Sequence, residues 1–221
     1  CCKGEKKVVD IIDGLFRDKR RGFIAHAAHR VSSRRRNNRA AKGPRNEASI
    51  IFGDVRGFTA FSEAKAPEQV VEALNTYLEL ATRVIIKFGG YIDKFIGDAV
   101  LGVFGVPVFR QDHVERAVRA AMYLQEELRK QSAGGNELLA AVGISIHTGP
   151  VVAGNVGSQS RMEYTVIGDS VNLAARLNAF AGPGEVIVSP QVKALLGAMI
   201  ETQSLGPQPI KGRSEPVEVF R

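Results

Sequence analysis

Residues 50–59 read IIFGDVRGFT, an apolar run that ends in the carboxylate of Asp54. Gly57 follows three residues later, and a helical pattern opens soon after it. An apolar run bounded in this way is typical of a buried strand, which would deliver Asp54 to the edge of a sheet. Backbone N–H groups that lie free beyond Gly57, ahead of a helix, favour an anion. We therefore predict that Ser49–Val55 is a buried strand with a functional site at its end.

A second carboxylate, Asp98, lies at a Gly-Asp turn between the apolar runs of residues 95–100, FIGDAV. Two carboxylates that are brought together repel each other, so one must be protonated or a cation must bind. Oxygen ligands of this kind favour Mg²⁺ or Mn²⁺. Taken singly, Asp54 and Asp98 are also explained as turn residues or helix caps. The spacing alone leaves both interpretations open.

The segments after the first strand alternate between helical and extended patterns. We predict a helix at Pro67–Phe88, a hairpin of Tyr91–Ile96 and Ala99–Phe104, a helix at Val114–Lys130 and a strand at Ala141–Ile146. With the first strand this gives the order βαββαβ. The predicted class is therefore α+β, with a ferredoxin-like core.

Further strands and helices are predicted at the C-terminal end of this core. Extended stretches are expected at Pro150–Gly157, Met162–Ile167 and Glu185–Ser189, helices at Ser170–Phe180 (capped by Asp169) and Pro190–Leu196, and edge strands at Ile200–Ser204 and Val217–Phe220.

The N-terminal segment differs from the rest of the chain in charge. Residues 1–46 hold 14 Lys and Arg against 4 Asp and Glu, a net charge of +10, whereas residues 47–221 hold 16 against 19, a net charge of −3. We predict a basic, partly helical linker over 1–46 and a folded domain over 47–221. A membrane-surface helix and a nucleic-acid arm are the alternatives for the linker. The near-neutral domain itself is not expected to bind nucleic acid.

Cysteine usage and hydropathy suggest the compartment. Cys1 and Cys2 are adjacent, and the rest of the chain is free of cysteine, which fits a reducing cytosol. No apolar run reaches 18 residues, and no secretory leader is visible. We expect a cytoplasmic domain, which could belong to a longer protein with an upstream regulatory or membrane-anchoring module.

Other polar residues are weaker candidates when taken alone. Asn172 and Arg176 are four residues apart on a predicted helix, so they share a face that could orient a sugar and clamp a phosphate. Lys211 is a further cation, on a loop that contains glycine. His113 and His147 are isolated, and we interpret both as structural. The P-loop and dinucleotide-binding motifs are absent from the sequence.

Three stretches together resemble the catalytic domain of class III nucleotidyl cyclases. They are residues 52–59 (FGDVRGFT), 93–100 (DKFIGDAV) and 164–176 (YTVIGDSVNLAAR). The resemblance runs from about residue 47 to the C-terminus, with the motifs in order, and it is strongest to the bacterial homodimeric adenylyl cyclases.

The resemblance implies a set of site residues. Asp54 and Asp98, assisted by the Val55 carbonyl, would hold two Mg²⁺ or Mn²⁺ ions per active site. Asn172 and Arg176 would stabilise the transition state.

The same resemblance implies how the triphosphate is bound. The backbone of Gly57, Phe58 and Thr59 would hold the β- and γ-phosphates, and Lys211 would be a phosphate-binding lysine.

Base selection would depend on Lys94 and Thr165. Lysine only donates hydrogen bonds, so Lys94 suits the acceptor N1 of adenine and faces another donor in guanine. The Thr165 hydroxyl can accept from the adenine amino group, but it can also donate, so it discriminates less. ATP is the expected substrate. Threonine at this place also resembles the bicarbonate-responsive subgroup, a hypothesis that unchanged turnover on adding bicarbonate at fixed pH would refute.

The resemblance further implies a head-to-tail homodimer with two composite active sites, in which one subunit supplies the metal aspartates and the other supplies the remaining residues. A guanylyl cyclase is the nearest alternative function. A non-catalytic cyclase-like domain, which only dimerises and relays a signal, is the other.

Overall fold

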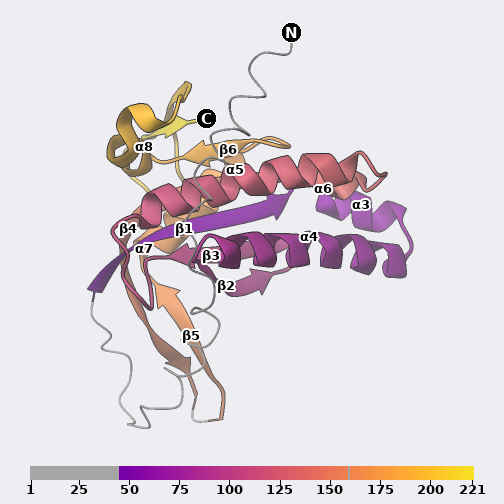
Figure 1. Ribbon diagram of the computed structural model, residues 1–221, viewed down its shortest axis with the longest axis horizontal. Coiled ribbons are helices and arrows are strands. Elements are labelled where there is room, and N and C mark those ends of the chain that lie inside the picture. The colour runs from indigo at the N-terminus through magenta and orange to yellow at the C-terminus, as the bar shows by residue number, and fades with distance from the viewer. Residues whose placement is uncertain (1–44, 159) are drawn as a thin grey trace, which may run out of the picture. The chain divides into compact units, whose positions relative to one another are not determined.

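Within residues 45–158 and 160–221, which the computed structural model describes, eight strands form one sheet (Figure 1). The strands are β1 (Arg45–Val55), β2 (Tyr91–Ile96), β3 (Ala99–Phe104), β4 (Val142–Gly157), β5 (Met162–Ile167), β6 (Val186–Val188), β7 (Ser204–Gln208) and β8 (Val217–Phe220). Their order is β2-β3-β1-β4-β6-β8-β7, and β5 pairs with β4 outside this path. All pairs are antiparallel except β4 with β6.

The helices follow the same chain order. They are α3 (Phe58–Ala64), α4 (Pro67–Lys87), α5 (His113–Ser132), α6 (Glu137–Ala140), α7 (Asp169–Leu177) and α8 (Pro190–Leu196), with 3₁₀ turns η1 (Asn178–Phe180) and η2 (Gly197–Met199).

Strand β1 lies at the centre of the sheet and is buried on both faces. Successive side chains of a strand point to opposite faces. Ile51 and Val55 accordingly join a core cluster with α4 and α5, whereas Ile50 and Ala48 join a second cluster on the other face. This two-sided burial explains why β1 reads as a continuous apolar run rather than as an alternating one.

Helices α4 and α5 pack against each other and cover one face of the sheet (Figure 1). The opposite face is covered in part by α7, whose Ala174 is fully buried against the second cluster. Asp54 lies two residues after Phe52 in β1 and therefore on this second face. The side chain of Asp54 thus lies on the face opposite α4 and α5, whereas that of Val55 packs in the core with these helices.

The predicted α+β class and the βαββαβ order are confirmed. The hairpin strands β2 and β3, the strand β5 and the helix α8 have the predicted bounds. Helices α4 and α5 differ from the prediction by one or two residues at their ends.

Four predicted details are wrong. The stretches Ala141–Ile146 and Pro150–Gly157 are one strand, β4, because its ladder with β1 continues without a break through Pro150. Strand β1 begins at Arg45 for the same reason, and β7 lies at Ser204–Gln208 rather than Ile200–Ser204. Asp169 is the first residue of α7 and caps nothing, because its carboxylate pairs with Arg213 instead.

The predictions for the basic linker over 1–46 fall almost entirely outside the described residues, and the boundary near Asn46 stays a prediction. Across the described residues, none of the helices combines the length and apolarity needed to cross a bilayer.

Helix α5 offers a matched test of the core. Leu128 is 1% exposed within the cluster under the sheet, whereas Met122 on the same helix is 41% exposed. We expect Leu128→Ala to lower the free energy of unfolding by about 2–5 kcal/mol, because it leaves a cavity. Met122→Ala should change it by less than about 0.5 kcal/mol. Denaturant unfolding checks both, and equal losses would contradict the assigned faces of α5.

Candidate active site

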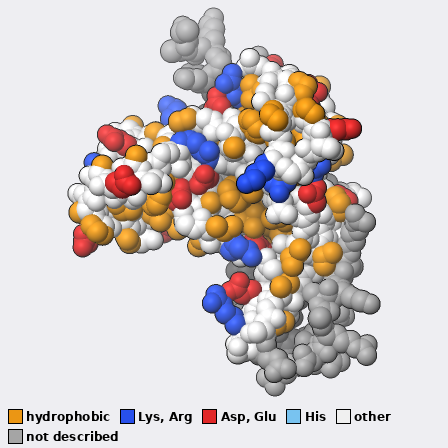
Figure 2. Space-filling model, turned by 180° about the vertical axis from the view of Figure 1, so that it is seen from behind, with side chains coloured by type: hydrophobic (Ala, Val, Ile, Leu, Met, Phe, Trp, Pro, Cys, Tyr) orange, Lys and Arg blue, Asp and Glu red, His pale blue; other side chains and the backbone are white. Residues whose placement is uncertain are grey.

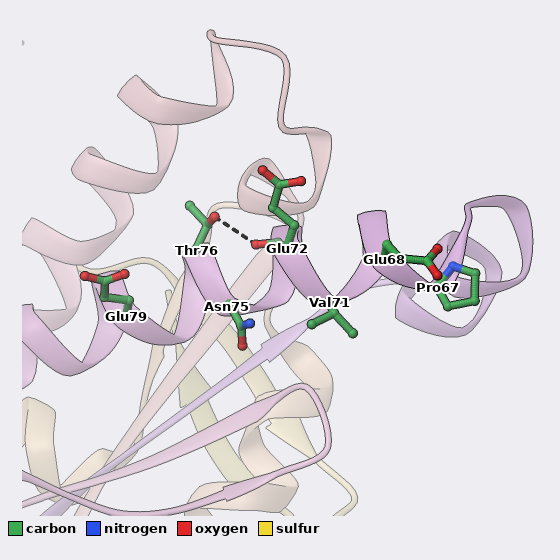
Figure 3. Close-up of a pocket in the computed structure, with 7 residues that line it drawn as sticks. All are labelled: Pro67, Glu68, Val71, Glu72, Asn75, Thr76 and Glu79. Atoms are coloured by element: carbon green, nitrogen blue, oxygen red, sulfur yellow. Dashed lines mark hydrogen bonds between the residues drawn. The ribbon is translucent and has the colours of Figure 1, made fainter.

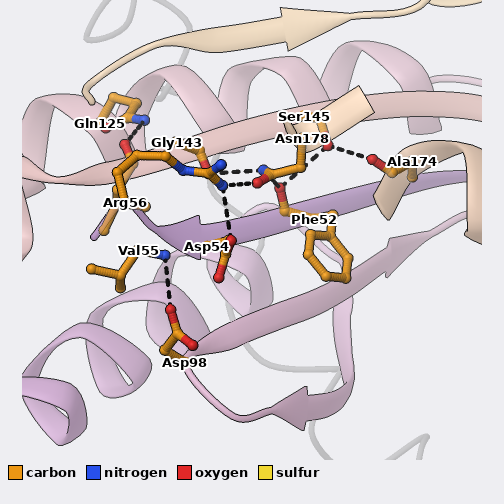
Figure 4. A network of polar contacts seen from close by, with 11 residues as sticks. Phe52, Asp54, Val55, Arg56, Asp98, Gln125, Gly143, Ser145, Ala174 and Asn178 are labelled. Atoms are coloured by element: carbon orange, nitrogen blue, oxygen red, sulfur yellow. Dashed lines mark hydrogen bonds and ion pairs between the residues drawn. The ribbon is translucent and has the colours of Figure 1, made fainter. Parts of the chain in front are cut away.

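Asp54 and Asp98 are brought together at one end of β1. Asp54 is the last residue but one of β1, and Asp98 follows Gly97 in the turn between β2 and β3. The Val55 backbone N–H donates to Asp98 Oδ2 at 3.3 Å, which holds the turn against the end of β1 (Figure 4). The fold therefore brings the two predicted carboxylates close together.

The electrostatics of this pair favour a cation. Burial, together with the Asp98 carboxyl group beside it, raises the pKa of Asp54 to about 6. Arg56 acts in the opposite direction, since its Nη2 lies 3.0 Å from Asp54 Oδ2. The charge of Asp54 is thus only partly compensated by the protein.

The side chain of Asn178 holds the guanidinium of Arg56 in place. Its side-chain Nδ2 donates to the carbonyls of Phe52 (2.8 Å) and Gly143 (3.0 Å), and its Oδ1 accepts from Arg56 Nη2 (Figure 4). Asn178 is 1% exposed. One buried amide therefore ties β1 to β4 and fixes the guanidinium that contacts Asp54.

The turn after β1 has the geometry that the glycine predicts. Gly57 has φ 71° at the N-cap of α3, in the left-handed region that favours glycine. Phe58 is half-buried against the core, and Thr59 is exposed. The backbone of these three residues therefore begins α3 directly beyond the acidic pair.

Lys94 and Thr165 come from distant parts of the chain and meet at Asp93. Thr165 Oγ1 donates to Asp93 Oδ2 at 2.8 Å, and Lys94 Nζ lies 3.4 Å from the same oxygen. The two predicted base-selecting residues are thus neighbours, on β5 and β2.

Asn172, Arg176 and Lys211 form a third group. Asn172 is exposed on α7, and Arg176 is half-buried one turn later. A Cβ built on Gly212 would lie 3.2 Å from Arg176 Nη1, so the guanidinium lies against the loop that carries the exposed Lys211. Arg213 of the same loop pairs with Asp169 at the start of α7. The loop is therefore held on α7.

Among the described residues of one chain, these three groups make no direct polar contact with one another. Among the described residues, no hydrogen bond or ion pair joins Asp54 or Asp98 to Lys94, Thr165, Asn172 or Arg176. Lys94 lies in β2, and Asp98 lies four residues later, in the turn that follows this strand. Figure 2 shows the face opposite that of Figure 1, where an apolar area is flanked by Lys, Arg, Asp and Glu side chains.

Two other features carry no chemistry of this kind. A pocket of about 620 Å³ lies along α4, lined by Pro67, Glu68, Val71, Glu72, Asn75, Thr76 and Glu79, and it contains none of the predicted residues (Figure 3). Within the described residues, His113 and His147 are buried and paired, His113 with Ser49 and His147 with Ser189, both at 2.9 Å. This fits the structural role expected for them.

Arg56, Asn178 and Asp93 were not singled out from the sequence. Their partners lie far along the chain: Asn178 contacts Phe52 126 residues away, and Asp93 contacts Thr165 72 residues away. Local periodicity carries no signal for such contacts. The position of Asp93 directly before Lys94 was the one available hint.

The chain is similar in sequence to a family of known proteins. Residues 41–220 match the family model of the adenylate and guanylate cyclase catalytic domain, and the chain belongs to that family. Adenylate cyclase 1 of Rhizobium meliloti (strain 1021) is 34% identical over 183 residues, which cover 80% of this chain and 27% of that protein. The chain thus spans about a quarter of the length of this relative.

Solved structures share the fold. The adenylyl cyclase CyaB from P. aeruginosa superposes with a TM-score of 0.74 at 32% identity, covering 81% of this chain and 94% of that one. A guanylyl cyclase gives 0.73 at 37% identity, with coverage of 80% and 92%. Cyclases named for either nucleotide are therefore equally similar, and the fold does not choose between ATP and GTP.

The acidic pair fits the divalent cations that this family implies. Its donors are hard carboxylate oxygens, which suit Mg²⁺ or Mn²⁺. In the part of the chain that the structure describes, no larger cluster of His, Cys, Asp or Glu forms a metal site. The pair Asp54 and Asp98 is the donor set to test.

Removing the Asp98 carboxylate tests two effects separately: its repulsion of Asp54 and its contribution to cation binding. Without divalent cations, we expect Asp98→Asn to raise the melting temperature by about 1–3 °C, because it removes a like charge beside Asp54. Added Mn²⁺ should stabilise the wild type but not the variant. Thermal unfolding in EDTA and in Mn²⁺ measures both effects.

The matched control is Glu79→Gln, which makes the same charge change at an exposed position of α4. It should keep the wild-type response to Mn²⁺. A variant at Asp98 that melts lower in EDTA, or that still responds to Mn²⁺ as the wild type does, would contradict this account of the pair.

Proposed function

We propose that this domain is an adenylyl cyclase that converts ATP to 3′,5′-cyclic AMP and pyrophosphate. The observation that carries the proposal is the meeting of Lys94 and Thr165 at one carboxylate, although 71 positions separate them. Together they offer a donor and a hydroxyl to the edge of a purine. Membership of the cyclase family supplies the reaction class.

Asp54, Asp98 and the Val55 carbonyl would hold two divalent cations, Mg²⁺ or Mn²⁺. When bound, such ions lower the pKa of a hydroxyl group and neutralise phosphate charge, which prepares the ribose 3′-oxygen and the triphosphate. Arg56 would keep the Asp54 carboxylate oriented, since Asn178 fixes the guanidinium in place.

The remaining residues would bind and orient the substrate. The 3′-hydroxyl would release its proton to solvent, and its oxygen would attack the α-phosphorus in line. That bond forms as the bond to pyrophosphate breaks, and pyrophosphate carries away the electron pair. Asn172 would orient the ribose. Arg176 would stabilise the charge that grows on the α-phosphoryl oxygens, by about 10²–10³ in rate if it acts as oxyanion donors do.

The triphosphate would be bound by backbone N–H groups and by Lys211. The N–H groups of Gly57, Phe58 and Thr59 would bind the β- and γ-phosphates, and Gly57 would permit close approach. Lys211 would add a positive charge from the loop next to Arg176.

We also propose a head-to-tail homodimer with two composite active sites. Its support is that, among the described residues of one chain, no direct polar contact joins the aspartate pair to Lys94, Thr165, Asn172 or Arg176. Strand alternation places Asp54 on the face of the sheet opposite α4 and α5. Figure 2 shows an apolar area on the molecular face opposite that of Figure 1, which a second copy could cover. One protomer would then supply the aspartates, and its partner would supply the other groups.

Mixing two inactive variants tests the composite site. Asp54→Ala and Arg176→Ala should each abolish cyclic AMP formation with Mn²⁺. A 1:1 mixture should recover about a quarter of the wild-type activity, because half of the dimers are mixed and each mixed dimer keeps one intact site. Cyclic AMP production measures this, with each variant alone as the control. No recovery after co-refolding would contradict the split site.

Substrate choice is tested by comparing ATP with GTP. We expect wild type to show the higher kcat/KM for ATP. Lys94→Glu should shift the ratio toward GTP by at least about tenfold, because a carboxylate accepts from guanine N1–H and repels the lone pair of adenine N1. Arg83→Glu, the same charge reversal on the exposed side of α4, should leave the ratio unchanged. A wild type that prefers GTP would favour the guanylyl alternative, and the absence of either product would favour the non-catalytic one.

A further inference from the structure

Asp93 is a buried carboxylate at an irregularity of β2. The ladder between β2 and β3 shifts register between Ile92 and Lys94, so Asp93 is the extra residue of a β-bulge. A bulge re-aims the side chains beside it. Here it brings the two neighbouring side chains together, with Lys94 Nζ 3.4 Å from Asp93 Oδ2. The Asp93 side chain is 0% exposed.

Four donors surround this carboxylate. Oδ1 accepts from the Val166 backbone N–H at 3.1 Å and from the Tyr91 hydroxyl at 3.3 Å. Oδ2 accepts from the Thr165 hydroxyl at 2.8 Å and faces the Lys94 ammonium. Burial, with Asp93 beside it, raises the pKa of Tyr91, so the Tyr91 hydroxyl remains a donor. A carboxylate held in this way acts as an acceptor toward every neighbour.

The Asp93 carboxylate determines which hydrogen bonds the Thr165 hydroxyl can make. A hydroxyl has one proton and two lone pairs. The competing acceptor of that proton, the Val166 carbonyl, is neutral and lies at 3.5 Å, so the charged Asp93 oxygen at 2.8 Å wins. With its proton committed to Asp93, the hydroxyl can only accept from a bound ligand.

We propose that Asp93 is a positioning residue for base selection, which sets the Thr165 hydroxyl as an acceptor and anchors Lys94 as a donor. This rests on the proposed function and deepens it. The adenine edge presents an amino donor next to the acceptor N1, which complements acceptor and donor in that order. Guanine, in the same pose, presents the acceptor O6 next to N1–H, so both contacts would be mismatched.

Asp93→Asn should reverse the direction of the hydrogen bond between the Thr165 hydroxyl and residue 93. The Val166 N–H is an obligatory donor, so it keeps the amide oxygen of Asn facing it, and the amide NH₂ then faces Thr165. The hydroxyl must accept from that NH₂, and its own proton becomes free for the O6 of guanine. We expect the ratio of kcat/KM for ATP to that for GTP, measured with Mn²⁺, to fall by about tenfold, the effect of roughly one mismatched hydrogen bond.

A second variant tests whether Asp93 acts through Thr165. Thr165→Val removes the hydroxyl at nearly constant volume, so it should lower the ratio by itself. In that background Asp93→Asn should have less than half of its original effect, expressed as log ratio. An undiminished effect would overturn the inference that Asp93 acts through the hydroxyl. Glu163→Gln, the same chemical change two residues before Thr165, is the matched control and should leave the ratio unchanged.

The ratio also guards against a folding defect. A misfolded fraction lowers turnover of both nucleotides equally, so it cannot move the ratio. A wild type that prefers ATP, with an unchanged ratio in Asp93→Asn, overturns this inference alone. A wild type that prefers GTP, or that makes neither product, overturns the proposed function and the inference with it.

Discussion

The constraint on which the structure depends is the two-sided burial of β1. A strand with α4 and α5 on one face and α7 on the other has no room for a charge until it leaves the sheet. Asp54 lies at that point, and the antiparallel partners of β1 bring in the β2–β3 turn with Asp98 and the backbone of Gly143 on either side. The acidic pair is therefore a product of sheet order, not of local sequence.

Packing and chemistry are joined at the same place by Asn178. Its amide donates to two backbone carbonyls and accepts from the Arg56 guanidinium, which also contacts Asp54. The helix that carries the proposed catalytic residues Asn172 and Arg176 ends one residue before Asn178. Asn178 therefore links the end of α7 to the arginine that contacts the acidic pair.

Sequence reasoning reached the elements and the named candidates, because both are local. The hairpin and α8 have strong turn and cap signals, and Asp54, Asp98, Lys94 and Thr165 lie in recognisable stretches. It failed where a contact at long range decided the outcome. The sequence analysis predicted two separate stretches, Ala141–Ile146 and Pro150–Gly157, but pairing with β1 carries one strand through both. For Asp93 the one hint was its position next to Lys94, because a bulge and residues of β5 determine its contacts.

Strand β4 runs without interruption from the residue paired with Asp54 to the residue paired with Thr165, that is, from Gly143 to Gly154. At the rise of a strand these eleven steps follow a path of about 36 Å along the backbone. One continuous strand therefore carries residues that pair with both proposed parts of the site, the cation-binding part and the base-binding part. In the proposed dimer, regulation would act on the angle between two protomers, and an upstream signal would need only to rotate one against the other.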